Sequence, residues 1–302
     1  MLKIKEYVRA ESLEQAYQLN QKKTNRIIGG MLWMKMSDAR IQTAIDLSAL
    51  GLDQIEENEE EYRIGCMVTL RQLELHEGLN EWSHGIVRES VKPIVGVQFR
   101  NLATVGGSIF GRFGFSDVLT CFLALDTYVE LYKGGVIPLE EFAEMEKDND
   151  ILVRLIVKKK PGLHAYLSHR NVKTDFPVLA VAVSADDRGA RAVVGARPSK
   201  AICVPLKEEW KKAIEEGRCT ELEAEQMAKE LAEQIPTGSN MRASAEYRSH
   251  LAGVLLKRAI LALLEERGRQ NADKCDAEWE KSDRRYQTGS AFDRFCEKSW
   301  ML

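Results

Sequence analysis

The chain has 302 residues, enough for two or three compact domains with hydrophobic cores of their own. Its 43 Lys and Arg residues nearly balance its 46 Asp and Glu residues, and the resulting formal charge of -3 argues against a dedicated nucleic-acid binder. The longest apolar stretches, such as 254–264, contain charged residues and fall short of the roughly 20 residues that cross a bilayer. Because the first residues also lack a hydrophobic signal segment, we expect a cytoplasmic protein without a membrane span.

The first part of the chain alternates predicted helices and strands. Ser12 followed by Gln15 predicts the start of a helix, and the apolar run 26–28 predicts a short strand that ends at the glycine pair Gly29-Gly30. This pattern is typical of a helix, a strand and a glycine turn in succession.

The same alternation continues after the first glycine pair. Residues 62–65 have the composition of a strand, and Thr69 with Gln72 predicts the start of a short helix. A second glycine pair, Gly106-Gly107, follows, and we interpret it as another place where a strand gives way to a loop.

An apolar helix is expected over residues 118–125, followed by strands over 127–132 and 151–157. The segment 158–162, which reads Lys-Lys-Lys-Pro-Gly, breaks the last of these strands. We therefore place a domain boundary near residue 160.

The second part of the chain begins with a predicted hairpin of strands over 178–184 and 190–196. Thr220 begins a capping-box pattern and so a helix, and a longer helix is expected over 243–264. The remaining residues, 265–302, are highly charged yet carry several aromatic residues, which favours docking on this chain or on a partner. These aromatic residues are Trp279, Tyr286, Phe292, Phe295 and Trp300.

The six cysteines and five histidines show no spacing typical of metal ligands. We therefore expect no metal ion and no iron–sulfur cluster bound within this chain.

The two glycine pairs together could form a binding site for an anion. Glycine lets backbone N–H groups approach an anion closely, so two such loops facing each other could hold a pyrophosphate. Neither loop has the Gly-x-Gly-x-x-Gly pattern of a Rossmann fold or the lysine of a P-loop. Each pair taken alone is more typical of a tight turn.

The residues around the glycine pairs are more specific. The sequence Gln-Phe-Arg-Asn-Leu-Ala-Thr-Val-Gly-Gly-Ser-Ile at 98–109, followed by Asp117, closely resembles the signature of the FAD-binding medium subunits of molybdenum hydroxylases, of the xanthine dehydrogenase and carbon monoxide dehydrogenase type. Ile-Ile-Gly-Gly at 27–30 resembles the first pyrophosphate loop of that family, and 242–248 resembles the start of its C-terminal helical segment. The resemblance spans residues 1 to about 264.

The resemblance implies an α+β fold with three segments. An FAD-binding domain of the vanillyl-alcohol-oxidase type would occupy 1–160, with two α/β lobes at about 1–55 and 56–160. A small antiparallel sheet with helices would form a C-terminal domain at 161–264, and the charged, aromatic-containing tail would follow at 265–302.

The resemblance also implies contacts to FAD in two loops and at three further positions. These are Ile27, Ile28, Gly29, Gly30, Met31, Leu32 and Trp33 in the first loop, Thr104, Gly106, Gly107 and Ser108 in the second, and Ile94, Asp117 and Leu152 elsewhere. The position of Asp117 also suits a helix N-cap. Arg112 fits either an additional phosphate partner or a surface arginine.

The chain departs from the family pattern in its first loop. Residues 31–34 read Met-Leu-Trp-Met where the family usually has polar residues, so no side-chain hydroxyl is available there for a pyrophosphate. Ser108 also replaces the more usual asparagine. Backbone amides still suffice in principle, because peptide donors do not depend on the side chain.

The resemblance implies an electron-transfer function: the FAD-binding subunit of a multi-subunit, xanthine dehydrogenase-like molybdenum hydroxylase, passing electrons from 2Fe-2S clusters of a small partner subunit through FAD to NAD. Molybdopterin would belong to a large partner subunit. The residues leave the acceptor open among NAD, NADP, ferredoxin and quinone-linked partners. The alternative is a flavin-free structural or assembly subunit of the same kind of complex, which the apolar segment 31–34 favours.

Overall fold

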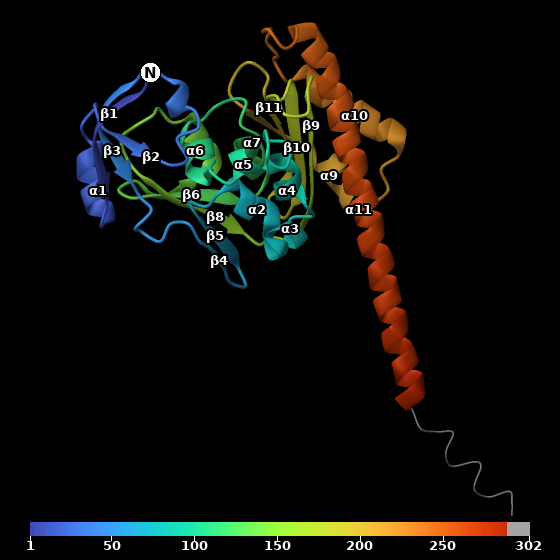
Figure 1. Ribbon diagram of the computed structural model, residues 1–302. Helices are drawn as coiled ribbons and strands as arrows, with labels where there is room; N and C mark the ends of the chain where they lie inside the picture. Colours follow the sequence, from blue (N-terminus) through green and yellow to red (C-terminus); the bar gives the residue numbers. More distant parts are fainter. Residues whose placement is uncertain (289–302) are drawn as a thin grey trace, which may run out of the picture.

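The computed structural model describes residues 1–288, with side chains as far as Gln270 (Figure 1). The described residues form three sheets: a parallel one of three strands, then antiparallel ones of five and four strands. Helices cover these sheets, and the sheets and helices together enclose two hydrophobic cores. The α+β class implied by the resemblance is confirmed.

The first lobe is built on the parallel sheet. Its elements are β1 (Lys3–Arg9), α1 (Leu13–Asn20), β2 (Arg26–Ile28) and β3 (Arg40–Asp46), with a 3-10 turn at Met34–Met36. The sheet order is β1-β3-β2, which places β3 in the centre and explains why Ile41, Ala44 and Ile45 are buried. The helix start at Ser12 and the strand at 26–28 are confirmed. The glycine pair therefore leaves the sheet at the carboxyl end of β2, the edge where open parallel sheets bind ligands.

The second lobe combines the five-stranded sheet with short helices. Its strands are β4 (Ile55–Glu57), β5 (Glu61–Gly65), β6 (Thr127–Leu131), β7 (Gly135–Pro138) and β8 (Leu152–Lys158). Its helices are α2 (Leu70–Leu75), α3 (Glu77–Trp82), α4 (Ile86–Val91), α5 (Val97–Arg100), α6 (Val105–Phe110), α7 (Asp117–Ala124) and α8 (Leu139–Glu144). The capping box of Thr69 and Gln72 at the start of α2 is confirmed.

The second glycine pair lies in a helix, and the expectation of a loop there was wrong. Thr104 is the N-cap of α6, and its Oγ1 accepts a hydrogen bond of 3.2 Å from the N–H of Gly107. The N–H groups of Val105 and Gly106 donate to the carbonyl oxygens of Val68 and Cys66, each at 2.8 Å. These partners satisfy the first turn of the helix and offset the low helix propensity of glycine.

The interpretation of Asp117 as a helix N-cap is also wrong. Ser116 is the N-cap of α7, because its Oγ accepts a hydrogen bond of 3.1 Å from the N–H of Leu119. Asp117 is the first residue of the helix, and its side chain is left to make other contacts. All eight residues of α7 are buried, so the helix fixes the place of this carboxylate firmly.

The C-terminal domain is a four-stranded sheet with three helices. Its elements are β9 (Gly162–His169), β10 (Leu179–Asp186), β11 (Gly189–Gly195), β12 (Ile202–Pro205), α9 (Glu208–Glu215), α10 (Glu221–Glu233) and α11 (Ala245–Thr288). The predicted hairpin is confirmed as β10 and β11, and the capping box of Thr220 and Glu223 begins α10. Helix α11 does not end near Leu264 as expected but continues to Thr288.

Only part of the segment 265–302, for which we predicted docking, lies within the described residues. Residues 265–288 form the last part of α11, whose side chains are described as far as Gln270. The predicted docking concerned Trp279, Tyr286, Phe292, Phe295 and Trp300, whose side chains lie outside the described residues.

Strand β10 joins the two hydrophobic cores, since all eight of its residues are buried. Ala180 and Ala182 belong to the hydrophobic core that also includes residues of the first and second lobes. Val181 and Val183 belong to the core under α10 and α11. Alternate residues of a strand point to opposite faces, so each face of this sheet packs against helices. The C-terminal domain is thereby held directly against α7. Across residues 1–288, no helix has both the length and the apolar character that a bilayer-spanning segment needs.

Candidate functional site

Two adjoining cavities lie on either side of the glycine segments. The first has a volume of about 550 Å³, and the second about 840 Å³. Both are lined by Ile27, Gly29, Thr104 and Gly107, so these four residues form the wall between them. Each volume is in the range of small-molecule and cofactor sites.

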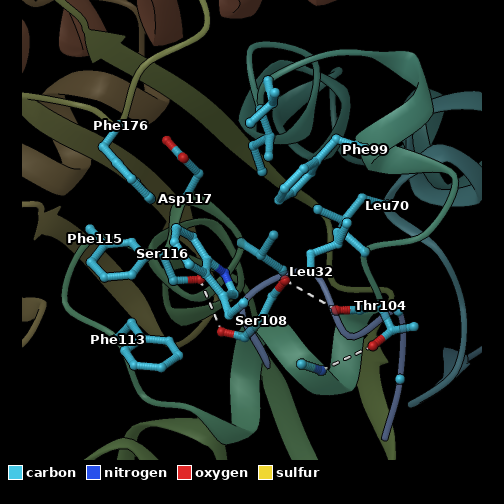
Figure 2. A pocket seen from close by; sticks show the side chains of 18 of the residues that line it. Leu32, Leu70, Phe99, Thr104, Ser108, Phe113, Phe115, Ser116, Asp117 and Phe176 are labelled. Carbon is cyan, nitrogen blue, oxygen red and sulfur yellow. Dashed lines mark hydrogen bonds between the residues drawn. The ribbon is translucent and has the colours of Figure 1, made fainter. Parts of the chain in front are cut away.

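Every residue that the resemblance singled out lines one of these cavities. The first cavity contains Gly30, Met31, Leu32, Trp33, Ile94, Ser108 and Asp117, the second contains Ile28, Gly106 and Leu152, and the shared wall contains the remaining four. Figure 2 shows the first cavity with Thr104 and Ser108 at one end and Phe99 and Phe176 at the other. The first cavity thus brings together residues of both lobes and, at Phe176, of the C-terminal domain.

Three of the four glycines are required by close approach of chain segments. A Cβ on Gly30 would lie 1.9 Å from the carbonyl oxygen of Leu102, and one on Gly106 would lie 2.8 Å from that of Cys66. A Cβ on Gly29 would lie 2.7 Å from Oγ1 of Thr104. These contacts are too short for any side chain, so the glycines allow the first loop to lie directly against the segment before α6.

Gly107 differs from the other three glycines. A Cβ there would meet only Oγ1 of Thr104, at 3.2 Å, and nothing else within 4 Å. Because Gly107 lines both cavities, a side chain at this position would occupy cavity space rather than collide with the protein. The absence of a side chain therefore leaves this cavity space free where the two cavities adjoin.

The two glycine segments differ in their backbone donors. In the described part of the chain, no group accepts a hydrogen bond from the N–H groups of residues 29–33. The N–H groups of Val105, Gly106 and Gly107 are all paired with protein acceptors. The first loop, which lines the first cavity, therefore offers unpaired backbone donors whatever side chains it carries.

The outer wall of the first cavity is aromatic. The rings of Trp33 and Phe176 are stacked with centroids 5.3 Å apart, and those of Phe113 and Phe115 are stacked at 5.1 Å. Phe115 also meets Phe176 edge to face at 4.7 Å. Such a wall suits a planar ring system, because stacking and edge contacts are favourable for aromatic groups.

A buried polar cluster interrupts this wall. Oδ1 of Asp117 accepts hydrogen bonds from Nη2 of Arg170, at 2.6 Å, and from the hydroxyl of Tyr166. Burial raises the pKa of the Asp117 carboxyl, and the charge of Arg170 opposes that shift. Burial also raises the pKa of Tyr166 well above its ordinary value, so its hydroxyl stays a donor.

Arg170 is a site residue that sequence reasoning missed. Its side chain is only 7% exposed and lines the first cavity. Its Nε is buried and has no hydrogen-bond partner among the described residues. The residue follows β9 in a loop without any recognisable pattern, so only the packing of the two domains reveals it.

Arg112 is neither a surface arginine nor a lining residue of the two cavities. It is 8% exposed, its Nε donates to the carbonyl oxygen of Phe142 at 2.8 Å, and its guanidinium lies 3.8 Å from the centroid of the Phe142 ring. Both expectations for Arg112 were therefore wrong, because it packs inside the second lobe. Among the described residues, no three His, Cys, Asp or Glu side chains are grouped as a metal site.

Residues 2–159 match the family model described as the FAD binding domain in molybdopterin dehydrogenase. The chain belongs to this family. Residues 164–263 match a second model, described as the CO dehydrogenase flavoprotein C-terminal domain. The chain is thus an FAD-binding molybdenum hydroxylase subunit of the CO dehydrogenase-like kind.

Comparisons with curated sequences and with solved structures also identify similar proteins. The curated "Uncharacterized protein YgfM" of Escherichia coli K12 is 24% identical over 258 residues, which are 84% of this chain and 94% of YgfM. The structure of quinoline 2-oxidoreductase from Pseudomonas putida 86 matches with a TM-score of 0.74 and 19% identity, over 87% of this chain and 97% of that one. Reconstituted CO dehydrogenase from Oligotropha carboxidovorans matches with a TM-score of 0.72 and 23% identity, over 86% of this chain and 97% of that one. These structures confirm the fold.

The residues of the FAD-binding subunit fit its cofactor. The unpaired N–H groups of residues 29–33 suit a pyrophosphate, and the aromatic wall suits the flavin ring. The missing hydroxyl in the first loop is therefore no obstacle to binding.

Proposed function

We propose that this chain is the electron-transfer subunit of a cytoplasmic, multi-subunit molybdenum hydroxylase of the xanthine dehydrogenase type. It would stand between the 2Fe-2S clusters of a small subunit and NAD, and a large subunit would hold molybdopterin. Bound FAD supplies the exchange between one-electron and two-electron carriers. The observation that carries this proposal is the pair of cavities joined at an N–H-lined glycine loop.

We assign the FAD contacts to the residues that line these cavities. The N–H groups of the first loop would hold the pyrophosphate at the junction, with Gly107 opposite. The ring system would occupy the first cavity, beside Ile94 and Asp117, because its wall is aromatic. The adenosine end would occupy the second cavity, which Leu152 lines.

In this proposal the protein binds, orients and shields its cofactor. The apolar side chains of the first cavity exclude water from the ring, and the Asp117 carboxylate with its two partners keeps one edge polar. No residue acts on the substrate that the complex hydroxylates, whose pocket would belong to another subunit. The FAD domain would extend over 1–160 and the C-terminal domain over 161–264.

The second candidate function is a flavin-free structural subunit. The absence of a polar side chain in 31–34 is the observation that favours it. The unpaired backbone donors of the first loop favour the flavin-bound function instead, because they make such a side chain unnecessary.

One experiment separates these functions. The chain is co-expressed with its partner subunits, purified, reduced with dithionite without oxygen, and then mixed with NAD, NADP, a ferredoxin or a quinone. We expect a complex that releases about one FAD per chain on acid extraction and that, once reduced, is reoxidised by NAD with formation of NADH. Reoxidation by another acceptor alone would refute the NAD assignment. A complex that assembles normally but releases no FAD on acid extraction would support the structural function.

A further inference from the structure

The segment that precedes α11 is organised by a buried arginine. Arg248 is fully buried, and its guanidinium donates to the carbonyl oxygens of Val178 at 2.9 Å and of Gly238 and Ala243 at 2.7 Å. It also donates to Oδ1 of Asn240 at 2.6 Å. Its hydrogen bonds therefore fix the path of residues 238–243 rather than pair its charge with a carboxylate.

This fixed segment carries Arg242, which reaches the loop between β9 and β10. Nε and Nη2 of Arg242 donate to the two carboxylate oxygens of Asp175, at 3.1 and 2.8 Å, in a bidentate ion pair. The guanidinium also lies 4.9 Å from the centroid of the Phe176 ring. In addition, Nδ2 of Asn171 donates to the carbonyl oxygen of Arg242 at 3.1 Å. Arg242 thus contacts the loop at two places, Asn171 and Asp175.

The same loop forms part of the flavin cavity. Asp175 and Phe176 line the first cavity, and Phe176 belongs to its aromatic wall (Figure 2). The carbonyl oxygen of Asp175 accepts a hydrogen bond of 2.7 Å from Nη1 of Arg170, whose Nη2 donates to Asp117. Direct contacts therefore run from Arg248 in the C-terminal domain to Asp117 in the cavity wall.

We propose that Arg242 is a positioning residue for the flavin: by binding Asp175 it holds the loop at 170–177 as one wall of the cavity. The tightness and geometry of FAD binding then depend on the C-terminal domain, although Arg242 lies outside the first cavity's lining. A bidentate arginine pair is suited to this role, because two parallel hydrogen bonds fix direction as well as distance. The inference rests on the proposed place of FAD.

The test compares three variants of the full chain with a matched control. Arg242→Ala removes the pair, Arg242→Lys keeps the charge but loses the bidentate geometry, and Asp175→Asn keeps the shape but loses the charge. Lys257→Ala is the control, because it breaks ion pairs of the same domain, with Glu221 and Glu225, away from the two cavities. FAD affinity is measured by titration, the ring environment by visible circular dichroism, and the loop at 170–177 by amide hydrogen exchange.

We expect Arg242→Ala and Asp175→Asn to weaken FAD binding about tenfold and to change the circular dichroism of the bound flavin. Arg242→Lys should recover part of both, and the control should match the wild type. Exchange at 170–177 should be faster in Arg242→Ala. If Arg242→Ala does not fold, the comparison of Arg242→Lys and Asp175→Asn with the control tests the proposal.

Wild-type affinity and circular dichroism in the variants would overturn the inference. The exchange measurement needs no FAD, so it separates this inference from the proposed function. If the wild type binds no FAD, the proposed function fails, and unchanged exchange at 170–177 would then refute the loop contact as well.

Discussion

Asp117 and Arg170 are 53 residues apart in the chain, yet Oδ1 of the first accepts a hydrogen bond of 2.6 Å from Nη2 of the second. Their side chains are only 6% and 7% exposed. Asp117 begins α7 in the second lobe, whereas Arg170 follows β9 in the C-terminal domain. The contact therefore makes one wall of the first cavity a property of both domains.

Replacing Asp117 by asparagine should weaken both the fold and FAD binding. The change leaves the buried charge of Arg170 without its partner, and breaking a buried ion pair in this way costs about 3 kcal/mol or more. Urea denaturation and FAD titration measure the two effects. The double variant Asp117→Asn, Arg170→Gln removes both charges and should recover part of the stability. Wild-type stability in the single variant would show that the pair contributes nothing.

Replacing Gly107 by valine should abolish FAD retention and spare the fold. The added Cβ would lie 3.2 Å from Oγ1 of Thr104 with no other atom within 4 Å, and the rest of the side chain would enter space at the wall between the cavities. Valine also suits a helix better than glycine does. Bound FAD is read from visible absorption after gel filtration, and stability from thermal unfolding. Gly253→Ala is the control, since a Cβ at that helical position meets nothing closer than 4.0 Å. A Gly107→Val chain with its full flavin content would place the cofactor elsewhere.

Replacing Gly30 by alanine should destabilise the chain even in the absence of FAD. Its Cβ would lie 1.9 Å from the carbonyl oxygen of Leu102, so the first loop must move away from the segment before α6. Such crowding costs about 1 to 3 kcal/mol. We expect this loss in urea denaturation of the chain without FAD. An apo variant as stable as the wild type would mean that the two segments lie farther apart.

The buried His164 should make the protein less stable in mild acid. Burial, and next the neighbouring His84, lower the pKa of His164 to about 3. The unfolded chain binds a proton at this residue near pH 6.5 and the folded chain does not, so stability is complete above that pH and falls as the pH decreases toward 3. At pH 5 the loss should be about 2 kcal/mol.

Urea denaturation between pH 7.5 and 4.5 tests this expectation. His164→Gln should flatten the pH dependence, whereas the exposed His250→Gln should leave it unchanged. An identical pH profile for His164→Gln and the wild type would assign the acid sensitivity to other groups.

Local signals predicted much of the fold. Thr69, Thr220 and Ser12 each begin a helix because a side-chain oxygen followed by Gln or Glu satisfies the first backbone donors. The hairpin of β10 and β11 was equally predictable from its turn. Strand β1 was missed because it pairs with β3, which lies beyond α1 and β2 in the chain. Strand β9 was missed although it pairs with the next strand, β10.

The residues that line the cavities also divide into those that a local pattern predicts and those that only tertiary packing brings there. The motif resemblance named all the glycine-loop residues, and these line the two cavities. Arg170 and Phe176 escaped notice because no local pattern marks them, and they reach the cavity only through the packing of the C-terminal sheet on α7. The helix at Gly106 and Gly107 was missed for a related reason, since its first donors are satisfied by residues 66–68.

The unpaired N–H groups of the first loop have a consequence for how this protein can vary. Every amino acid except proline carries the same backbone donor, so substitutions at residues 31–33 can change the polarity of the first cavity while keeping the N–H groups that we assign to the pyrophosphate. Relatives with serine or threonine there and this chain with methionine and leucine would then bind the same group by the same atoms. A proline introduced at any of these positions is the change that deletes a ligand outright.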